Sequence, residues 1–461
     1  MLSNETADGI RAGTFIRGPR WLGSAISGLW RVMRVLLSTY SCGPDLGSEP
    51  GIGWNWALRS ARLGHEVLLL MRAVDVGPVE AALTRYREAS RIRIIPYDPP
   101  WLPNRAKTGH RLIRFHNLLW QIGAFFFLRR RIKELEPDLV HHLTWGVFRQ
   151  PSLLGLLGRP FVFGPVGGGE TAPTRLRYHF SALAHLFEAL RDALNWLALI
   201  DPLMTATFSR AGVIAVKTDE TKLRIPQRFH HKVVRYLELG IDASVLAEPA
   251  PREVTATSHP LRILFVGRLI HWKGIYYVAA AYRRLMEELP EAELTIVGQG
   301  IDAARLKRFA GRLGIAHRIR WIARVEHTEM GKLYRGHDLC LFPSLHDSSG
   351  NVALEALSHG LPVVTLDLGG PKEIVDESCG RVIGTKGLMP DEVITALARA
   401  LYELNDGAVR ETLVEGARAR ARDFIWEHRI QKFYGMVGEA LGLYTAKRRA
   451  VATARSFGHA E

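Results

Sequence analysis

Arg268 and Lys273 are two cations that follow a short apolar stretch, residues 263–266, in a glycine-rich segment. Gly267 and Gly274 flank them, and a helical pattern comes next. A strand that passes through such a loop into a helix is a natural phosphate site, because backbone amides and the helix dipole attract an anion. The two cations would add charge-assisted contacts to a diphosphate, although solvated surface charge is the usual role of Arg and Lys.

Asp347 and Glu355 are two carboxylates with seven residues between them. Gly350 lets the backbone approach a ligand closely, and the amides of Asn351 and Val352 would face a phosphate at a helix N-terminus. Glu355 would lie one turn into that helix, where it can accept hydrogen bonds from paired ribose hydroxyls. The alternative is an N-cap aspartate and an ordinary surface glutamate. Cations and carboxylates in this order suit a nucleotide sugar.

The remaining chain predicts two doubly wound α/β domains that face a central cleft. The strand-like stretches are residues 34–38, 66–70, 93–95, 138–141, 161–163 and 212–216, and then 262–266, 294–297, 318–322, 339–342 and 363–367. Short apolar runs between helical patterns are typical of a buried parallel sheet. The predicted order is a tail (1–32), a first domain (33–247), a linker (248–260), a second domain (261–424), a helix packing back on the first domain (425–445) and a tail (446–461).

Gly51 and Gly53 lie in a glycine-rich segment, residues 47–53, after the first predicted strand. We expect this loop to approach the donor phosphate, although a tight turn would also use glycine. His141 and His142 end a later strand. One of them is predicted to contact the sugar, and the sequence leaves open which one; the other could be a hydrogen-bonded core histidine.

Several motifs together resemble the family-4 retaining glycosyltransferases of the GT-B fold (glycosyltransferase group 1), over nearly all of residues 34–443. These motifs are Gly267-Arg268-Leu269 with Lys273-Gly274, Gly298-Gln299-Gly300, the segment 347–355, Gly360-Leu361-Pro362-Val363-Val364 and Gly369-Gly370-Pro371-Lys372-Glu373.

The resemblance implies roles for single residues. Arg268 and Lys273 would hold the donor diphosphate and stabilise the departing nucleotide, and Glu355 would bind the ribose. Asp347 stands where the family usually has glutamate near the donor sugar, so its reach and sugar preference differ. The family's histidines usually read His-x-His, whereas here they are adjacent. The resemblance implies front-face substitution that needs positioning and charge stabilisation, with no metal and no cofactor.

Composition limits the partners and the compartment. The net charge of +15 favours anionic partners, and the sequence contains no recognised nucleic-acid module. Three scattered cysteines fit a reducing cytoplasm. Residues 101–133 carry cations and aromatics but no Asp or Glu, which suits either an anionic membrane surface or a core helix with a charged end. The predicted partners are a nucleotide-diphosphate sugar, a glycan or lipid-linked acceptor, and the inner membrane face.

Three other functions remain as alternatives. Asp347 and the adjacent histidines favour a catalytically silent nucleotide-binding scaffold with a transferase fold. A phosphorylase would need a phosphate site and usually pyridoxal phosphate, for which no lysine-bearing motif is present. An NAD oxidoreductase would carry G-x-G-x-x-G after the first strand, and this pattern is missing.

Overall fold

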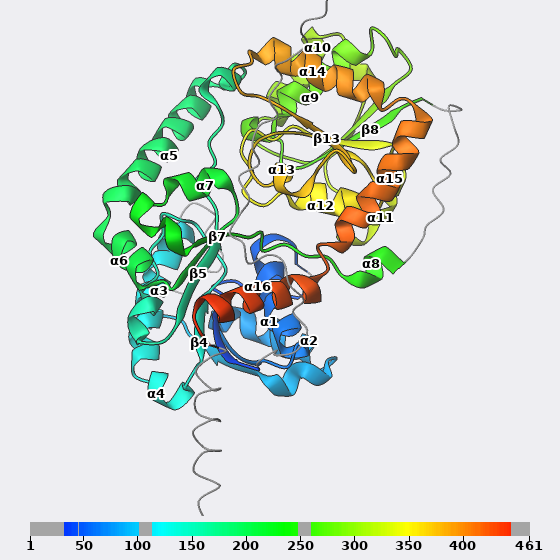
Figure 1. The fold of residues 1–461 in the computed structure, drawn as a ribbon. Helices are drawn as coiled ribbons and strands as arrows, with labels where there is room; N and C mark the ends of the chain where they lie inside the picture. The colour runs from blue at the N-terminus through cyan, green and yellow to red at the C-terminus, as the bar shows by residue number, and fades with distance from the viewer. Residues whose placement is uncertain (1–31, 45, 101–112, 248–259, 444–461) are drawn as a thin grey trace, which may run out of the picture. The chain divides into compact units, whose positions relative to one another are not determined.

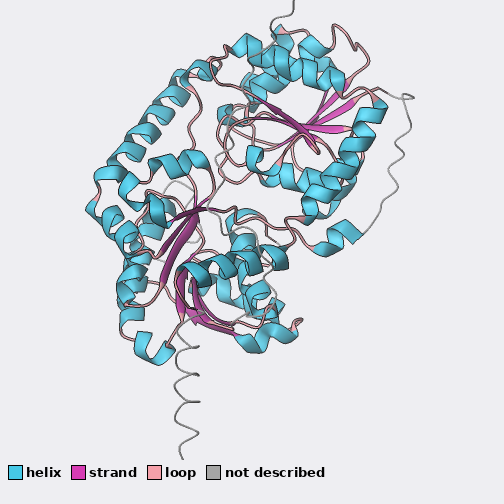
Figure 2. Cartoon of the chain, viewed as in Figure 1, coloured by secondary structure: helices cyan, strands magenta, loops and turns pink. Residues whose placement is uncertain are grey.

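Two parallel sheets organise the computed structural model, which describes residues 32–44, 46–100, 113–247 and 260–443. Figure 2 shows the strands gathered into these two separate sheets. The predicted tails, apart from Val32, and all but the last residue of the predicted linker lie outside the described residues.

The first sheet has seven strands in the order β3-β2-β1-β4-β5-β6-β7. Its strands are β1 (Arg34–Ser38), β2 (Glu66–Met71), β3 (Ile92–Pro96), β4 (Leu139–His142), β5 (Phe161–Val166), β6 (Val213–Val216) and β7 (Val233–Arg235). The accompanying helices are α1 (Ser48–Arg62), α2 (Val76–Leu83), α3 (Ile113–Arg129), α4 (Ile132–Leu135), α5 (Ala182–Ile200), α6 (Pro202–Arg210), α7 (Asp219–Arg224) and α8 (Ala243–Ala247). Short 3-10 helices include η3 (Leu153–Leu157) and η5 (Gln227–Lys232).

The second sheet has six strands in the order β10-β9-β8-β11-β12-β13. Its strands are β8 (Arg262–Val266), β9 (Glu293–Val297), β10 (Ile319–Ile322), β11 (Leu339–Phe342), β12 (Val363–Leu366) and β13 (Gly380–Ile383). The helices of this half are α9 (Ile275–Leu285), α10 (Ala303–Arg312), α11 (His327–Arg335), α12 (Asn351–Ser358), α13 (Pro371–Ile374), α14 (Pro390–Glu403), α15 (Gly407–Arg422) and α16 (Trp426–Ala440).

Helices cover both faces of the first sheet. Leu36 of β1 packs in one core with Trp120 of α3 and Phe208 of α6. On the opposite face, the ring of His141 in β4 stacks 5.3 Å from that of Phe433 in α16. Because side chains alternate between the faces of a strand, both sets must be apolar, and the strands read as unbroken apolar runs.

The last helix, α16, packs against α1 of the first half of the chain (Figure 1). The ring of Trp56 in α1 lies 5.0 Å from that of Phe433. The chain is also paired where it enters α16, since the amide of Ile241 donates to Phe424 O at 2.8 Å and that of Trp426 donates to Ile241 O at 3.1 Å. One face of the first sheet is therefore covered by α16, which follows the second sheet in the chain.

Helix α3 belongs to the core in its described part. Trp120 is fully buried and its indole N–H donates to Tyr97 O at 2.7 Å. Phe125 and Leu128 are also buried. Of the two alternatives for residues 101–133, the core helix with a charged end therefore fits α3; residues 101–112 lie outside the described residues.

Local signals define α5 and α6. Ser181 caps α5, with its hydroxyl accepting from the amide of Ala184 at 3.1 Å. Asp201 then caps α6 by accepting from Leu203 N at 2.8 Å, and Pro202 occupies the first helical position, where its missing N–H has no intrahelical partner to lose.

Candidate functional site

The loops that follow β8 and β11 meet at the point where the strand order of the second sheet reverses. β8 lies between β9 and β11, so the chain leaves β8 toward one side and returns to β11 on the other. The amide of Leu345 donates to Trp272 O at 2.8 Å across these loops. Gly274, at φ +71°, fits only without a side chain, since a Cβ there would lie 1.9 Å from Pro343 O. Ligands of doubly wound sheets bind at such reversals.

The two predicted cations both lie on the loop after β8. Arg268 is exposed, and its guanidinium stands 5.9 Å from the Trp272 ring centre. Lys273 is half-buried, with Nζ against the Asp347 carboxylate and 5.1 Å from the ring centre of Phe342. In the described part of the chain no ion pair involves Arg268, so its charge is available to an anion.

Asp347 is held ionised by its surroundings. Burial raises the pKa of its carboxyl, but the charge of Lys273 and two amide hydrogen bonds outweigh burial, and the net shift is downward. Those amides belong to Ser349 and Gly350, each 3.3 Å from Oδ1. Asp347 therefore positions the turn before α12 and neutralises Lys273.

Helix α12 begins at Asn351, where the sequence predicted a helix start, and no side chain caps it. Gly350 precedes it at φ +82°, which favours glycine. The amides of Asn351 and Val352 make no hydrogen bond in the described structure. One turn later, Glu355 accepts from the Tyr334 hydroxyl at 2.8 Å. The two amides at the helix N-terminus can therefore bind an anion, and a positioned carboxylate lies one turn away.

Gly267 lies at a close-packed position and does not open a space for a ligand. Its carbonyl oxygen would lie 1.9 Å from a Cβ at Gly298. The predicted residues of the second half therefore share one region: Gly267, Arg268, Lys273, Asp347, Gly350, Asn351, Val352 and Glu355 lie on two adjacent loops and on α12.

Gly51 and Gly53 do not form the predicted phosphate loop. Helix α1 already begins at Ser48, so both glycines are helical and buried. A Cβ at Gly51 would lie 2.0 Å from Leu46 O, and one at Gly53 would lie 2.6 Å from Ser41 O. The prediction was wrong because these glycines serve the close packing of the helix on the preceding loop.

His141 is a core residue and not a free ligand group. Nε2 lies 2.7 Å from Gly164 O and Nδ1 lies 3.1 Å from the Tyr434 hydroxyl. Burial lowers the pKa of its imidazole to about 4, so the ring is neutral. With both ring nitrogens bonded and Phe433 against the ring, His141 cannot contact a sugar as one alternative proposed.

His142 points to the opposite face of the sheet. Its ring lies 5.3 Å from that of Phe163, and burial lowers its pKa to about 3. Its Nδ1 is buried and has no hydrogen-bond partner within the described structure. Of the two adjacent histidines, His142 is the one with an unused ring nitrogen.

A buried carboxylate that the sequence reading did not select, Glu170, joins the two halves of the chain. It accepts from Thr218 Oγ1 at 2.6 Å, from Thr221 Oγ1 at 2.7 Å and from Ser348 Oγ at 2.5 Å. The amide of Gly168 adds a fourth bond of 2.8 Å. Burial raises the pKa of Glu170, but the three hydroxyls outweigh it and the pKa is lowered.

Lys217 forms a second buried connection. Its Nζ lies 2.6 Å from Glu238 Oε1 and 3.2 Å from Ser349 Oγ, and Ser349 also donates to Glu238 at 2.6 Å. Glu49 stands 4.0 Å from the same ammonium and accepts from Trp145 N at 2.7 Å. Ser349 thus touches a cation and a carboxylate from the first half.

A third connection runs through Glu188 of α5. His346 Nε2 lies 3.0 Å from Glu188 Oε1, and its Nδ1 lies 3.1 Å from the guanidinium of Arg191. The His346 ring stacks on Trp272, the aromatic neighbour of Arg268, at 5.2 Å and 15°. The loops that carry Arg268 and Asp347 are therefore supported from the first half of the chain.

The sequence carried a weak signal for these residues. Lys217 directly follows the buried strand β6, and Glu170 follows β5 after three glycines. Polar residues at carboxyl ends of parallel strands are candidates for a site. Their partners in the second half, Ser349 and Ser348, lie more than a hundred residues away, so these two pairings could not be predicted from the sequence.

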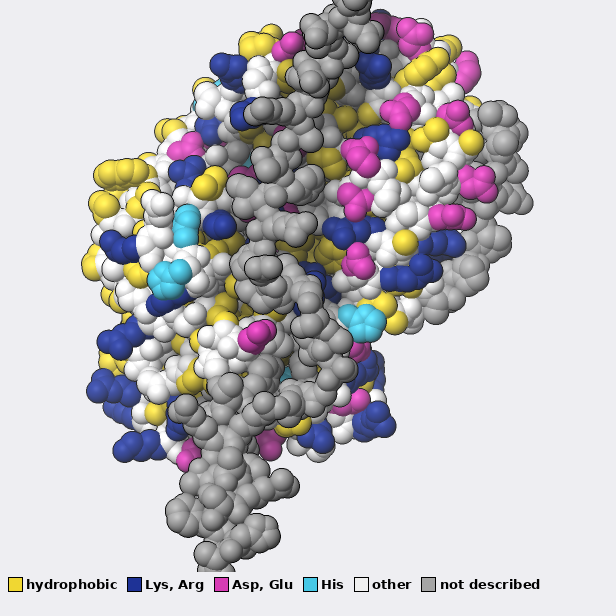
Figure 3. Space-filling model, in the orientation of Figure 1, with side chains coloured by type: hydrophobic (Ala, Val, Ile, Leu, Met, Phe, Trp, Pro, Cys, Tyr) yellow, Lys and Arg dark blue, Asp and Glu magenta, His cyan; other side chains and the backbone are white. Residues whose placement is uncertain are grey.

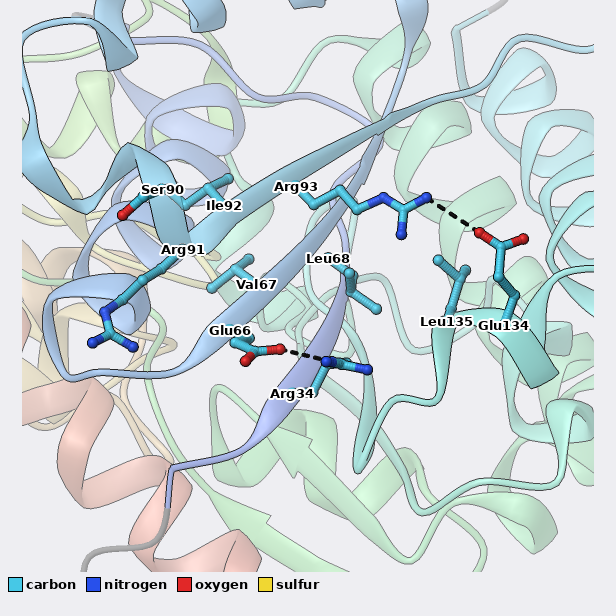
Figure 4. A pocket seen from close by; sticks show the side chains of 10 residues that line it. All are labelled: Arg34, Glu66, Val67, Leu68, Ser90, Arg91, Ile92, Arg93, Glu134 and Leu135. Carbon is cyan, nitrogen blue, oxygen red and sulfur yellow. Dashed lines mark hydrogen bonds and ion pairs between the residues drawn. The ribbon is translucent and has the colours of Figure 1, made fainter.

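A separate hollow of about 460 Å³ opens at the other edge of the first sheet (Figure 4). It lies where β1 and β2 begin, the edge opposite to that used by ligands of such sheets. Its cations are engaged: Arg34 pairs with Glu66 at 2.7 Å and Arg93 with Glu134 at 3.3 Å. We assign the hollow no part in the site.

Neither a metal-binding cluster nor a membrane-spanning helix is found among the described residues. No group of three or more His, Cys, Asp and Glu side chains among them could hold a metal ion. None of the described helices is long and apolar enough to cross a membrane.

Comparisons with known proteins identify a family and sequence relatives of this chain. The profile of the family described as Glycosyl transferases group 1 matches residues 260–406. The glycogen synthase of Mycobacterium tuberculosis (strain CDC 1551 / Oshkosh) is 33% identical over 323 residues, which cover 69% of this chain and 71% of that protein.

Two solved structures share the fold. Sucrose-phosphate synthase from Thermosynechococcus elongatus superposes with a TM-score of 0.60 at 19% identity, covering 90% of this chain and 100% of that one. Anabaena HepE in complex with UDP and glucose gives a TM-score of 0.54 at 16% identity, covering 88% and 98%. The predicted architecture of two doubly wound domains is confirmed.

Proposed function

This chain belongs to the glycosyl transferases group 1 family, with the GT-B fold, and we propose that it is a retaining, family-4 type enzyme. It moves a hexosyl group from a nucleotide-diphosphate sugar to a hydroxyl acceptor. The observation that carries this proposal is one arrangement: Arg268, which has no ion pair within the described residues, and the uncapped start of α12 border the same strand-order reversal.

The donor occupies this reversal in the proposal. Its diphosphate lies between Arg268, Lys273 and the amides of Asn351 and Val352, which supply positive charge from two sides. Glu355, held by Tyr334, accepts hydrogen bonds from the ribose. Asp347 contacts both Lys273 and the sugar hydroxyls in the proposal. Because the bound sugar takes up part of the hydrogen-bonding capacity of Asp347, Lys273 moves toward the phosphates when the donor binds.

The proposed reaction is a front-face substitution. The bond between the sugar C1 and the diphosphate oxygen breaks, and a new C1–O bond to the acceptor forms on the same face. The departing diphosphate takes the acceptor proton. The protein then contributes position and electrostatic stabilisation of the leaving group, which Arg268 and Lys273 provide without a metal ion.

The acceptor belongs to a cell-envelope polysaccharide or glycolipid in this proposal, and the enzyme works at the cytoplasmic face of an anionic membrane. Support comes from the net charge of +15, which favours an anionic surface. His142, with its unused Nδ1 at the carboxyl end of β4, is the proposed sugar-contacting histidine.

A second candidate is a catalytically silent nucleotide-binding scaffold. It is favoured by the contact between Lys273 and Asp347, because each neutralises a group that catalysis would use. Such a protein would bind a nucleoside diphosphate and never consume a nucleotide sugar.

Calorimetry tests the proposal with UDP, GDP and ADP on wild type and on Arg268→Ala. UDP is the first to try because the Anabaena protein was solved with UDP and glucose. We expect one nucleotide to bind, and Arg268→Ala to weaken it by about 10- to 100-fold, as for loss of one hydrogen bond to a charged group.

Arg324→Ala is the matched control, because Arg324 is a well-exposed arginine of the same half. It should leave affinity unchanged. Release of nucleoside diphosphate from the corresponding nucleotide sugar then separates enzyme from scaffold. If none of the three nucleotides binds, the proposed donor site is wrong.

A further inference from the structure

Helix α5 carries its apolar side chains outward. Its large exposed apolar residues are Leu183, Leu186, Phe187, Leu190, Leu194, Trp196, Leu197 and Ile200, each between 43% and 64% exposed. We call these eight residues the α5 apolar face. Six of them follow the spacing of one helical stripe, and Ile200 and Trp196 lie beside it.

Two polar side chains of α5 point inward instead. Glu188 and Asn195 are buried, and they bond to His346 Nε2 at 3.0 Å and to the guanidinium of Arg149 at 2.9 Å. A surface helix of a water-soluble domain has the opposite arrangement. The inversion shows that the outer side of α5 is suited to an apolar medium.

Neighbouring elements extend this surface. Leu203 of α6 is 45% exposed, and Leu156 of η3, which α6 contacts, is 43% exposed. Figure 3 shows hydrophobic side chains at the left edge, over α5 and α6. Soluble monomers rarely expose a contiguous apolar patch above a few hundred Å².

Cations border the apolar surface. The end of α3 and the start of α4 carry exposed Arg129, Arg130, Arg131 and Lys133, and Figure 3 shows Lys and Arg side chains over α4. α3 and α6 both contact η3, so the helix that leads into the cationic rim and a helix of the apolar surface share this neighbour. None of these four cations has an ion-pair partner among the described residues.

We propose that the α5 apolar face inserts into the headgroup region of an anionic lipid bilayer, with the cationic rim on the lipid phosphates. Apolar side chains with flanking cations and an interfacial tryptophan are what such a surface binds. The inference deepens the proposed function, since it rests on a membrane-borne acceptor, but it assigns the apolar contact to α5 and takes from residues 101–133 only the cations at the end of that segment.

A second copy of the chain fits this surface less well. A two-fold contact through the α5 apolar face would bring the same patch of each copy together. Such a contact would bury the apolar side chains but would leave the cationic rim without an anionic partner. Anionic lipid satisfies both parts of the surface at once.

Vesicle flotation of the full chain tests the proposal, using phosphatidylcholine vesicles with and without phosphatidylglycerol. We expect wild type to float with the anionic vesicles. The triple variant Leu186→Gln, Phe187→Gln, Leu190→Gln should bind at least tenfold more weakly; these side chains are exposed, so the fold is retained. Ile301→Gln with Tyr402→Gln removes exposed apolar groups elsewhere and should float like wild type.

The rim gives an independent readout. Arg129→Gln, Arg130→Gln and Arg131→Gln together should weaken binding severalfold, and added salt should weaken wild type similarly. Failure of wild type to float, equal flotation on neutral vesicles, or undiminished flotation of the triple variant would overturn the proposal. So would a dimer that the triple variant abolishes in sedimentation without any flotation.

Nucleotide calorimetry on the same samples separates this inference from the proposed function. The triple variant should keep wild-type nucleotide affinity, because the α5 apolar face lies outside the donor site. If wild type binds a nucleotide but does not float, the lipid contact alone is rejected; if wild type floats but binds no nucleotide, the donor site alone is rejected.

Discussion

Ser348 donates a 2.5 Å hydrogen bond to Glu170, and this bond ties the loop after β11 to the loop after β5. The Glu170 carboxylate also accepts hydrogen bonds from the hydroxyls of Thr218 and Thr221 and from the amide of Gly168. A conformational change that separates the two loops must break the bond to Ser348, whereas the others remain within the first half of the chain.

Glu170→Gln should make stability less dependent on pH. The pKa of Glu170 lies below its ordinary value of 4.5, so its charged form stabilises the fold above that value. The stabilisation is lost as pH falls through the lower folded pKa. We expect the variant to lose about 2 kcal/mol at pH 7, as for a bond to a charged group. The difference from wild type should shrink in urea unfolding at pH 4 and below.

Glu291→Gln supplies the control, since Glu291 is exposed on the surface. It should match wild type at both pH values. A wild-type curve parallel to that of Glu170→Gln across the whole acid range would contradict the role of the Glu170 charge.

Lys273→Met and Asp347→Asn should each lower the free energy of unfolding by about 2 kcal/mol, because each leaves the other half-buried charge without its partner. The double variant should recover much of that loss but bind the nucleoside diphosphate as weakly as Lys273→Met. Urea unfolding and calorimetry on all four proteins form a double-mutant cycle.

The exposed pair Lys332 and Glu329 on α11 is the comparison for this cycle. Its coupling should fall below detection, as for most surface pairs. Strictly additive effects of Lys273→Met and Asp347→Asn would show that the two side chains act independently.

Glu355→Ala should abolish discrimination between the bound nucleotide and its 2′-deoxy form. Wild type should favour the ribonucleotide, because Glu355 accepts from the ribose in our proposal. Tyr334→Phe keeps the carboxylate but removes its 2.8 Å hydrogen bond, so an intermediate preference is expected. Calorimetry with both nucleotides measures the ratio; equal affinity in wild type would exclude the ribose role.

His141→Phe and His142→Phe are a matched pair with opposite outcomes. His141→Phe leaves the Tyr434 hydroxyl without its imidazole partner and should destabilise the fold by about 2 kcal/mol. His142→Phe keeps ring packing on Phe163 and should change stability little. It should lower kcat for nucleotide-sugar consumption, and full activity would exclude His142 from the sugar site.

The sequence predicted most strands of both sheets, because buried parallel strands are continuous apolar runs. Residues 34–38, 262–266 and 339–342 match β1, β8 and β11. Two edge strands were missed, β7 and β13. Both are short and carry arginine, and edge strands need less apolar sequence because one side is unpaired.

Site prediction succeeded where the contacts are local in sequence and failed where they are distant. The start of α12 is set by Gly350 next to it, so it was readable. The environment of His141 depends on Tyr434, 293 residues away. The helical state of Gly51 depends on close packing, which composition does not distinguish from a flexible loop.

The position of α16 determines the order in which the protein can fold during synthesis. Trp56 and His141 are covered by Phe433 and Tyr434, which leave the ribosome after the strands of both sheets. The sheet that is made first therefore waits, with one face uncovered, until the second sheet has emerged. A stalled or truncated chain that ends before α16 exposes this face, and it is a substrate for chaperones and proteases.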